Sequence, residues 1–206
     1  MIARCTIAAA REVAGEGGMA AVQIAPVARR AGIAAGTVYR YFPGKTDLVA
    51  ALLSEISARE IAALRRSADV APGPLSALSA AIMTFATRAL GNRRLTFAAI
   101  AEPVDAELDA TRLAFRKVLA TEFSARIAAA AAGGHLPAQD SALAGAALLG
   151  CIIEALIGPV APDAAGRERD IVRSVTLIAL RALGVADARA RGLVVQTALP
   201  AEAALQ

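Results

Sequence analysis

Apolar residues recur every three or four positions along most of the chain, which is the spacing of one buried face of an α-helix. In the first seventy residues this spacing predicts helices over about 4–14, 23–31, 35–42 and 45–67. Further helices are predicted over 75–91, 93–101, 105–131, 139–158 and 166–183. Alternating β-branched residues are missing until Leu193–Val195, so the predicted fold class is all-α. Residues 185–206 fit either a frayed tail or a short extra helix.

Proline and glycine divide this helical pattern into two unequal parts. The string Pro-Gly-Pro at 72–74 follows the fourth predicted helix, and such residues end helices and permit sharp turns. We therefore predict a small helical domain over residues 1–46, a connecting helix over 47–71 and a larger helical domain over 72–206.

The net positive charge of the chain comes entirely from its first third. Residues 1–66 hold nine Arg and Lys against five Asp and Glu, whereas residues 67–206 hold thirteen of each. A basic domain joined to a neutral one suggests that the first part binds a polyanion, although an excess of this size also fits an ordinary solvated surface.

The composition argues against an enzyme, a metal site and a disulfide framework. Cys5 and Cys151 lie far apart, His135 is the single histidine, and no nucleophile, base and orienting group share a suggestive spacing. We expect no cofactor. Charged residues from Arg4 onward interrupt any secretory leader, which predicts a cytoplasmic protein. Aromatic residues make up only 3%, so the core must be built from closely packed Ala, Leu, Ile and Val.

One apolar segment, Ala142–Val160, has the length of a membrane span and carries a single charge, Glu154. A carboxylate is costly in lipid, Pro159 interrupts the segment, and no basic or aromatic anchors flank it. We predict a buried helix instead, covered on one side by its own domain and on the other by a partner, with no membrane association.

Residues 27–42 fit the geometry of a helix-turn-helix. Ala28 supplies the small residue needed where two helices cross, and Gly32, four positions later, can take the positive φ of the turn. The residues spaced to point both helices into a common core are Val27, Ala31, Ile33, Val38 and Tyr41. The polar residues left facing outward are Arg29, Arg30, Thr37, Tyr39 and Arg40.

These outward residues predict a DNA-binding surface. In the major groove Arg40 is suited to pair with guanine, while Thr37 and the hydroxyls of Tyr39 and Tyr41 hold phosphates. Lys45 begins the next helix, where its side chain and the exposed amides of the helix end can hold a further phosphate. The alternative is a helical hairpin that only caps the larger domain, which leaves the polar set unexplained.

The segment Ala31–Leu48, AGIAAGTVYRYFPGKTDL, resembles the TetR (TetR/AcrR) family of transcriptional regulators. The family form has a glycine turn, Gly-Thr, Tyr-x-Tyr-Phe and Lys-x-x-Leu, and the resemblance extends over residues 4–55. It implies a three-helix DNA-binding head, a connecting helix, a ligand-binding body, and dimerisation through two long C-terminal helices.

The chain departs from the family pattern in two places on the surface that the resemblance assigns to DNA, which includes Gln23, Ala34 and Ala35. Ala34 and Ala35 stand where the family often has a polar residue followed by Lys, and Val22, with Gln23 beside it, replaces the usual Thr. Phosphate contacts and a helix cap are lost, so we expect weaker DNA binding or a stronger dependence on Arg40, Lys45 and the flanking Arg29 and Arg30. Loss of DNA binding is the alternative.

A ligand-binding body needs polar groups in apolar surroundings and large side chains to line a cavity. Glu154, set among Ile and Leu, needs an arginine, a hydroxyl or a cationic ligand as a partner if it is buried, and the candidate arginines are Arg112, Arg116 and Arg88. The alternative is that Glu154 bonds a neighbouring helix or faces solvent at a dimer edge. We assign the effector site to Glu154, Arg112, Phe115 and Phe97, with core packing as the alternative for the aromatic residues.

Two apolar helix faces favour a homodimer. The first comprises Ala142, Gly145, Ala146, Leu149, Gly150 and Ile153, and the second comprises Val172, Val175, Leu177, Ile178, Leu180 and Leu183. Two such helices from each chain form a four-helix interface, and two-fold symmetry implies a palindromic operator. The leading hypothesis is a repressor released from double-stranded operator DNA by an unknown small-molecule effector. An activator, an enzyme and a helical or membrane-associated scaffold are the alternatives.

Overall fold

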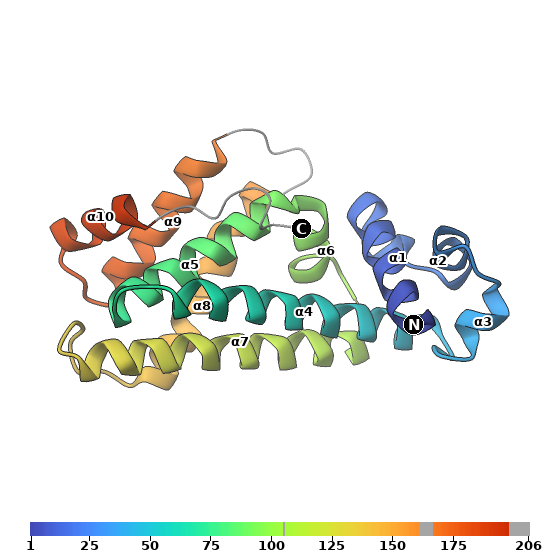
Figure 1. The fold of residues 1–206 in the computed structure, drawn as a ribbon, viewed down its shortest axis with the longest axis horizontal. Coiled ribbons are helices and arrows are strands. Elements are labelled where there is room, and N and C mark those ends of the chain that lie inside the picture. The colour runs from blue at the N-terminus through green and yellow to red at the C-terminus, as the bar shows by residue number, and fades with distance from the viewer. Residues whose placement is uncertain (105, 161–166, 198–206) are drawn as a thin grey trace.

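The computed structural model describes residues 1–104, 106–160 and 167–197, and within these ranges the chain is helical throughout, without a strand (Figure 1). The predicted all-α class is therefore confirmed. The elements are α1 (Ile2–Gly17), η1 (Met19–Ala21), α2 (Ile24–Ala31), α3 (Ala35–Tyr39), α4 (Lys45–Asp69), α5 (Pro74–Gly91), α6 (Arg93–Ile100), α7 (Ala106–Ala132), α8 (Ser141–Val160), α9 (Glu168–Ala182) and α10 (Asp187–Gln196).

The helices follow the predicted ones closely, with differences at their ends. Helix α1 continues through Gly15 and ends only where Gly18 adopts a φ of 77°. The third helix ends at Tyr39 and not at Phe42. Residues 187–196 form a helix, so the described part of the C-terminal segment is not a frayed tail, and the alternation at Leu193–Val195 lies within that helix.

Two clusters of buried side chains divide the molecule. The first joins α1, α2 and α3 to the beginning of α4 and also includes Ala98, Ala99 and Leu108 from α6 and α7. The second joins the end of α4 to α5, α7, α8, α9 and α10. We call these two parts the head and the body. Helix α4 contributes Leu48 and Leu52 to the head core and Leu64 to the body core, so it belongs to both.

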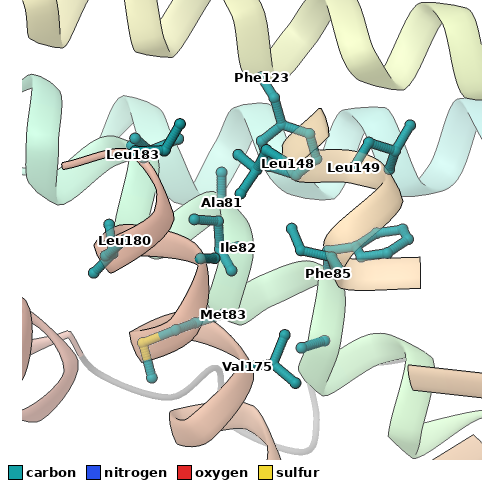
Figure 2. Packing of buried hydrophobic residues seen from close by; sticks show 14 of the residues in the cluster. Ala81, Ile82, Met83, Phe85, Phe123, Leu148, Leu149, Val175, Leu180 and Leu183 are labelled. Atoms are coloured by element: carbon teal, nitrogen blue, oxygen red, sulfur yellow. The ribbon is translucent and has the colours of Figure 1, made fainter. Parts of the chain in front are cut away.

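The body core is built around α5, as Figure 2 shows. Ile82, Met83 and Phe85 of this helix meet Phe123 from α7, Leu148 and Leu149 from α8, and Val175 and Leu180 from α9. Helices α7 and α8 approach closely at Gly145, where a Cβ atom would lie 2.7 Å from the Ala120 carbonyl oxygen. Small residues therefore allow the close helix packing that an aromatic-poor composition predicts.

Helix α8 passes the length and composition test for a membrane span, with a mean hydropathy of 2.0. Its inner face packs in the body core through residues that include Gly145, Leu149 and Ile153. Leu143, Ala147 and Gly150 lie exposed on the outer face. The helix is thus half covered by its own chain, and the face predicted for dimerisation is split between these two sides.

The second predicted dimer face is also mostly internal. Val172, Val175, Leu180 and Leu183 are buried within the chain, and Ile178 is half exposed. These residues were predicted to contact a partner because periodicity identifies an apolar face but not what covers it. The side of α9 left uncovered includes Ile178 and Ala182.

Candidate nucleic-acid interface and ligand pocket

The turn between α2 and α3 has the geometry that the sequence predicts. Gly32 takes a φ of 68° and ψ of 30°, and the Ile33 amide donates to the Ala28 carbonyl oxygen at 3.0 Å. Such a turn satisfies the last carbonyls of a helix and favours glycine because the left-handed backbone crowds a Cβ. Val27, Ala28 and Val38 are buried and fix the crossing of the two helices.

The core position predicted for Tyr41 is wrong. Tyr41 is 45% exposed, whereas the neighbouring Phe42 is buried in the head core. Helix α3 ends at Tyr39, and Phe42 bonds through its amide to the Val38 carbonyl at 2.9 Å, which turns its ring inward. Tyr41 is therefore free to present its hydroxyl at the surface, the other role predicted for it.

The residues predicted to contact DNA lie mostly at the surface of the head. Exposed members are Gln23, Arg29, Ala34, Tyr39, Arg40, Tyr41 and Lys45, and the half-buried members are Ala35 and Thr37. The Arg40 guanidinium lies 5.5 Å from the centre of the Tyr41 ring, a distance typical of a cation–π contact. In the described part of the chain no carboxylate forms a salt bridge with Arg29, Arg40 or Lys45.

The start of α3 lacks a side-chain cap. Ala34 is the N-cap residue and offers only its backbone carbonyl, to the Thr37 amide at 2.9 Å. Gln23 precedes α2 in the same position, but its side-chain amide donates to the Ala20 carbonyl oxygen at 3.2 Å. The absence of a cap at Ala34 agrees with the expectation drawn from the sequence.

Arg30 is exposed, as predicted, but it is not an unpaired cation that could contact DNA. Its guanidinium forms ion pairs with Glu12 at 3.2 Å and Glu16 at 2.6 Å, which join α2 to α1. The hydrogen bond from Arg30 lowers the pKa of the Glu16 carboxyl. Arg30 therefore serves the packing of the head, because two glutamates lie one helical turn apart on the facing side of α1.

Lys45 is the first residue of α4 and is exposed. The preceding Gly44 donates its amide to Asp47 Oδ2 at 2.9 Å, so a carboxylate partly satisfies this helix end. The start of α4, with the exposed Lys45, follows the exposed Arg40 by five residues along the chain.

A pocket lies where the head meets the body, between α1, α4, α5, α6 and α7. Its empty volume is about 620 Å³ including its open mouth. The lining residues are Arg11, Ile56, Arg59, Glu60, Phe85, Arg88, Ala89, Asn92, Leu95, Thr96, Ala99, Ile100 and Phe115. The wall is mainly apolar, with a few charged groups, as is common in small-molecule sites.

The charged groups of this pocket differ in their partners. The Arg88 guanidinium is buried and donates two hydrogen bonds to the Glu60 carboxylate, each 2.9 Å long. Arg59 pairs with Glu55. Arg11, which enters from α1 in the head, has a buried Nε atom without a hydrogen-bond partner in the described structure.

The predicted effector residues are not brought together. Phe115 lines the pocket, whereas Phe97 packs against the body core outside the lining. Glu154 is exposed on the outer side of α8, so the buried, arginine-paired carboxylate is wrong and the predicted alternative of solvent exposure holds. The expected partner Arg88 is bound to Glu60 instead. Glu154 lies on the side of α8 that no other part of the described chain covers. Its neighbours in the sequence are apolar, so the sequence does not show which side of the helix is exposed.

Arg112 does not line this pocket and forms contacts within the chain. It donates to the Glu102 carbonyl oxygen at 2.8 Å, and burial lowers the pKa of its guanidinium. The Glu102 carboxylate in turn accepts from the Met19 amide at 2.8 Å and pairs with Arg94 at 3.1 Å. Arg112 and Glu102 thus belong to a polar junction that joins the head to α6 and α7.

Sequence reasoning missed Arg11, Glu60 and Arg88 as a group of pocket residues. They come from three different helices, so no local spacing relates them. The only signal was Arg88 itself, a single arginine in an otherwise apolar helix, which the sequence left as one of several possible partners for Glu154.

Comparison with known proteins relates the head to bacterial regulators. Residues 7–52 match the model of bacterial regulatory proteins of the tetR family. A segment of 67 residues, 32% of this chain, is 42% identical to the HTH-type transcriptional repressor KstR of Mycobacterium tuberculosis. The matched segment spans 30% of the length of that repressor.

Solved structures match the fold over nearly the whole chain. RolR in complex with resorcinol superposes with a TM-score of 0.74 at 22% identity, covering 97% of this chain and 95% of RolR. FadR from Bacillus subtilis in complex with stearoyl-CoA gives a TM-score of 0.75 at 23% identity, covering 85% and 96%. Residues 7–52 are thus similar to the tetR family of bacterial regulatory proteins, and the chain as a whole shares the fold of these solved structures.

Proposed function

We propose that the chain is a ligand-responsive transcriptional repressor, which binds a palindromic operator as a homodimer and is released by a small-molecule effector. The observation that carries this proposal is the group of exposed, carboxylate-free cations, Arg29, Arg40 and Lys45, on a helix-turn-helix. We assign DNA binding to residues 1–46, connection to 47–71, and ligand binding and dimerisation to 72–206.

Each cation has a distinct role in this proposal. Arg40, at the end of α3, pairs with guanine in the major groove, where its fork of donors matches the two acceptors of that base. Lys45 and the amides at the start of α4 hold a phosphate. The hydroxyl groups of Thr37, Tyr39 and Tyr41 contact phosphates of the DNA backbone. Gln23, Ala34 and Ala35 lie at the edge of this surface and contribute less.

A second copy of the chain is the proposed partner of α8 and α9. Leu143, Ala147 and Cys151 of α8 border a groove whose other wall includes Ala182 of α9. Ile178 lies half exposed on α9, one helical turn before Ala182. Two-fold pairing of these helices forms a four-helix interface and sets the recognition helices about 34 to 36 Å apart, one turn of DNA.

The effector is proposed to occupy the pocket between the head and the body. RolR and FadR are described in complex with resorcinol and stearoyl-CoA, so proteins of this fold hold small organic molecules. The head and the body can adopt one arrangement that binds DNA and another that does not. A ligand that binds the second arrangement more tightly weakens DNA binding, and the size of this effect is limited by the ratio of its affinities for the two arrangements.

The test is fluorescence anisotropy of the purified protein with DNA from upstream of its own gene, across a salt series, with unrelated DNA of equal length. We expect a preference of about a thousandfold for the upstream fragment and a steep salt slope. Sedimentation of the saturated complex should give one dimer per fragment. Equal weak binding to both fragments would refute the proposal.

Three variants assign the contacts. Arg40→Ala should weaken binding about tenfold or more and relax the preference at one base pair, because a bidentate base contact is lost. Lys45→Ala should weaken binding to all sequences and reduce the salt slope by about one. Arg66→Ala is the matched control, an exposed arginine of α4 distant from α3, and should leave both quantities unchanged.

A further inference from the structure

The pocket between head and body contains one cation whose charge nothing in the described chain balances. Three arginines and one glutamate line it. Arg88 is neutralised by Glu60 and Arg59 by Glu55, which leaves Arg11. Arg11 Nε is buried without a hydrogen-bond partner, an arrangement that costs free energy until an acceptor is supplied.

The rest of the pocket wall suits a hydrocarbon group. Ile56, Phe85, Leu95, Ile100 and Phe115 supply most of its apolar surface from four helices of the chain. An occupant therefore needs an apolar part and one acceptor group placed near Arg11.

We propose that the effector is an amphipathic monocarboxylate whose apolar part lies among these side chains and whose carboxylate accepts hydrogen bonds from Arg11. This inference rests on the proposed function and specifies its ligand. A carboxylate matches the paired donors of a guanidinium, and charge-assisted bonds of this kind are about twice as strong as neutral ones.

Other ligand classes fit the pocket less well. A cation meets no free carboxylate, because Glu60 is held by Arg88 in a two-bond ion pair. A neutral apolar molecule leaves Arg11 Nε unsatisfied. A phosphate dianion brings two negative charges to a site with a single unneutralised guanidinium.

The position of Arg11 also assigns the route of regulation. Arg11 lies on α1 in the head, while Phe85 and Phe115 lie on α5 and α7 in the body. A monocarboxylate that contacts Arg11, Phe85 and Phe115 bridges the head and the body. Its binding stabilises the arrangement of head and body in which these contacts form, and it disfavours a different arrangement needed for DNA binding.

Isothermal titration of the full-length protein with four probes tests this inference: octanoate, 4-phenylbutanoate, octan-1-ol and octylamine. We expect at least one of the two acids to bind about tenfold or more tightly than the alcohol and the amine. Arg11→Gln should weaken binding of that acid about tenfold and leave the alcohol unchanged, and Arg11→Lys should retain part of the preference. Arg4→Gln, an exposed change on the same helix, is the matched control.

Three results overturn the inference: no acid binds, the alcohol or amine binds as tightly as the acids, or Arg11→Gln binds the acid like the unchanged protein. Circular dichroism of each variant establishes that it is folded. Operator anisotropy with the same samples separates the two proposals. Acid binding without operator binding refutes the proposed function alone, and operator binding without acid binding refutes only this ligand assignment.

Discussion

Three cations of the head and five arginines of the body differ in their partners. Arg29, Arg40 and Lys45 in the head are exposed and form no salt bridge within the described chain. The body arginines with carboxylate partners include Arg65, Arg88, Arg93, Arg94 and Arg126. The net charge of +4 therefore understates how strongly the DNA-binding surface attracts a polyanion.

The difference shows that the partner of an arginine, more than its presence, determines its role. Arg30 directly follows the unpaired Arg29 in α2, yet its ion pairs with Glu12 and Glu16 join α2 to α1. Arg11 is the converse case, a cation beside the body that remains unpaired. Charge counts along a sequence cannot separate these cases, because the partners come from other helices.

The largest effects are expected when one paired arginine, Arg88, and one arginine without a salt bridge, Arg40, are each replaced by alanine. Arg88→Ala should lower the free energy of unfolding by about 3 kcal/mol, because it leaves the Glu60 carboxylate unpaired in a largely buried site. Arg40→Ala should change the free energy of unfolding by less than about 0.5 kcal/mol while weakening DNA binding. Urea denaturation measures the stability of both, and equal losses would contradict the distinction.

A smaller loss of stability is expected at the junction between head and body. Gly18 has φ 77° and ψ −177°, a backbone region that is essentially restricted to glycine. A Cβ atom there would also collide with Arg94 and with the Glu102 carboxylate, which accepts the hydrogen bond from the Met19 amide of the head. Gly18→Ala should therefore cost about 2 kcal/mol in the free energy of unfolding.

The control for Gly18 lies on the same helix. Gly15 is helical, and a Cβ atom at this position meets no atom within 4 Å. Gly15→Ala should stabilise the protein by up to about 1 kcal/mol, because alanine is the better helix former. Thermal unfolding that gave the two variants the same sign of change would contradict the proposed strain at Gly18.

The smallest expected effect concerns a paired carboxylate of the body and depends on pH. Arg65, and after it Arg126, donate hydrogen bonds to Glu122 and lower its pKa. A carboxyl with a lowered folded-state pKa stabilises the protein above its ordinary pKa of about 4.3, and this contribution disappears as the pH falls through the folded-state value.

Glu122→Gln should thus lower the free energy of unfolding at pH 7 by about 0.5 to 1 kcal/mol, with little difference from the unchanged protein in strong acid. Glu154→Gln, which alters an exposed carboxylate without a salt bridge in the described chain, should show no such pH dependence. Denaturation at a series of pH values provides the measurement. A pH-independent loss for Glu122→Gln would indicate a packing role instead.

Local features of the sequence predicted the head accurately. Gly32, Ala28 and the apolar residues of α2 and α3 interact with neighbours a few positions away, so their spacing determines the turn. Tyr41 was misplaced because α3 ends one turn earlier than its pattern implies, and Phe42 takes the inward position.

The body could be predicted only as a series of helices. Which side of α8 and α9 faces the core depends on how distant helices pack, and both apolar stripes were assigned to a partner although much of each is internal. For the same reason the interpretation of Glu154 as a buried carboxylate was wrong. The pocket combines Arg11, Glu60 and Arg88 from helices separated by long stretches of chain, which no local pattern relates.

Helix α4 connects the head rigidly to the body, so a rotation at one end displaces the other end. Its 25 residues contain no glycine or proline, so it is a stiff rod about 37 Å long with one end in each core. A tilt of about 5° about the body end displaces the other end by about 3 Å, several times the range of about 0.5 Å over which hydrogen-bond lengths vary. Ile56 and Glu60 line the pocket near the middle of this rod, so a small displacement there is magnified at the far end.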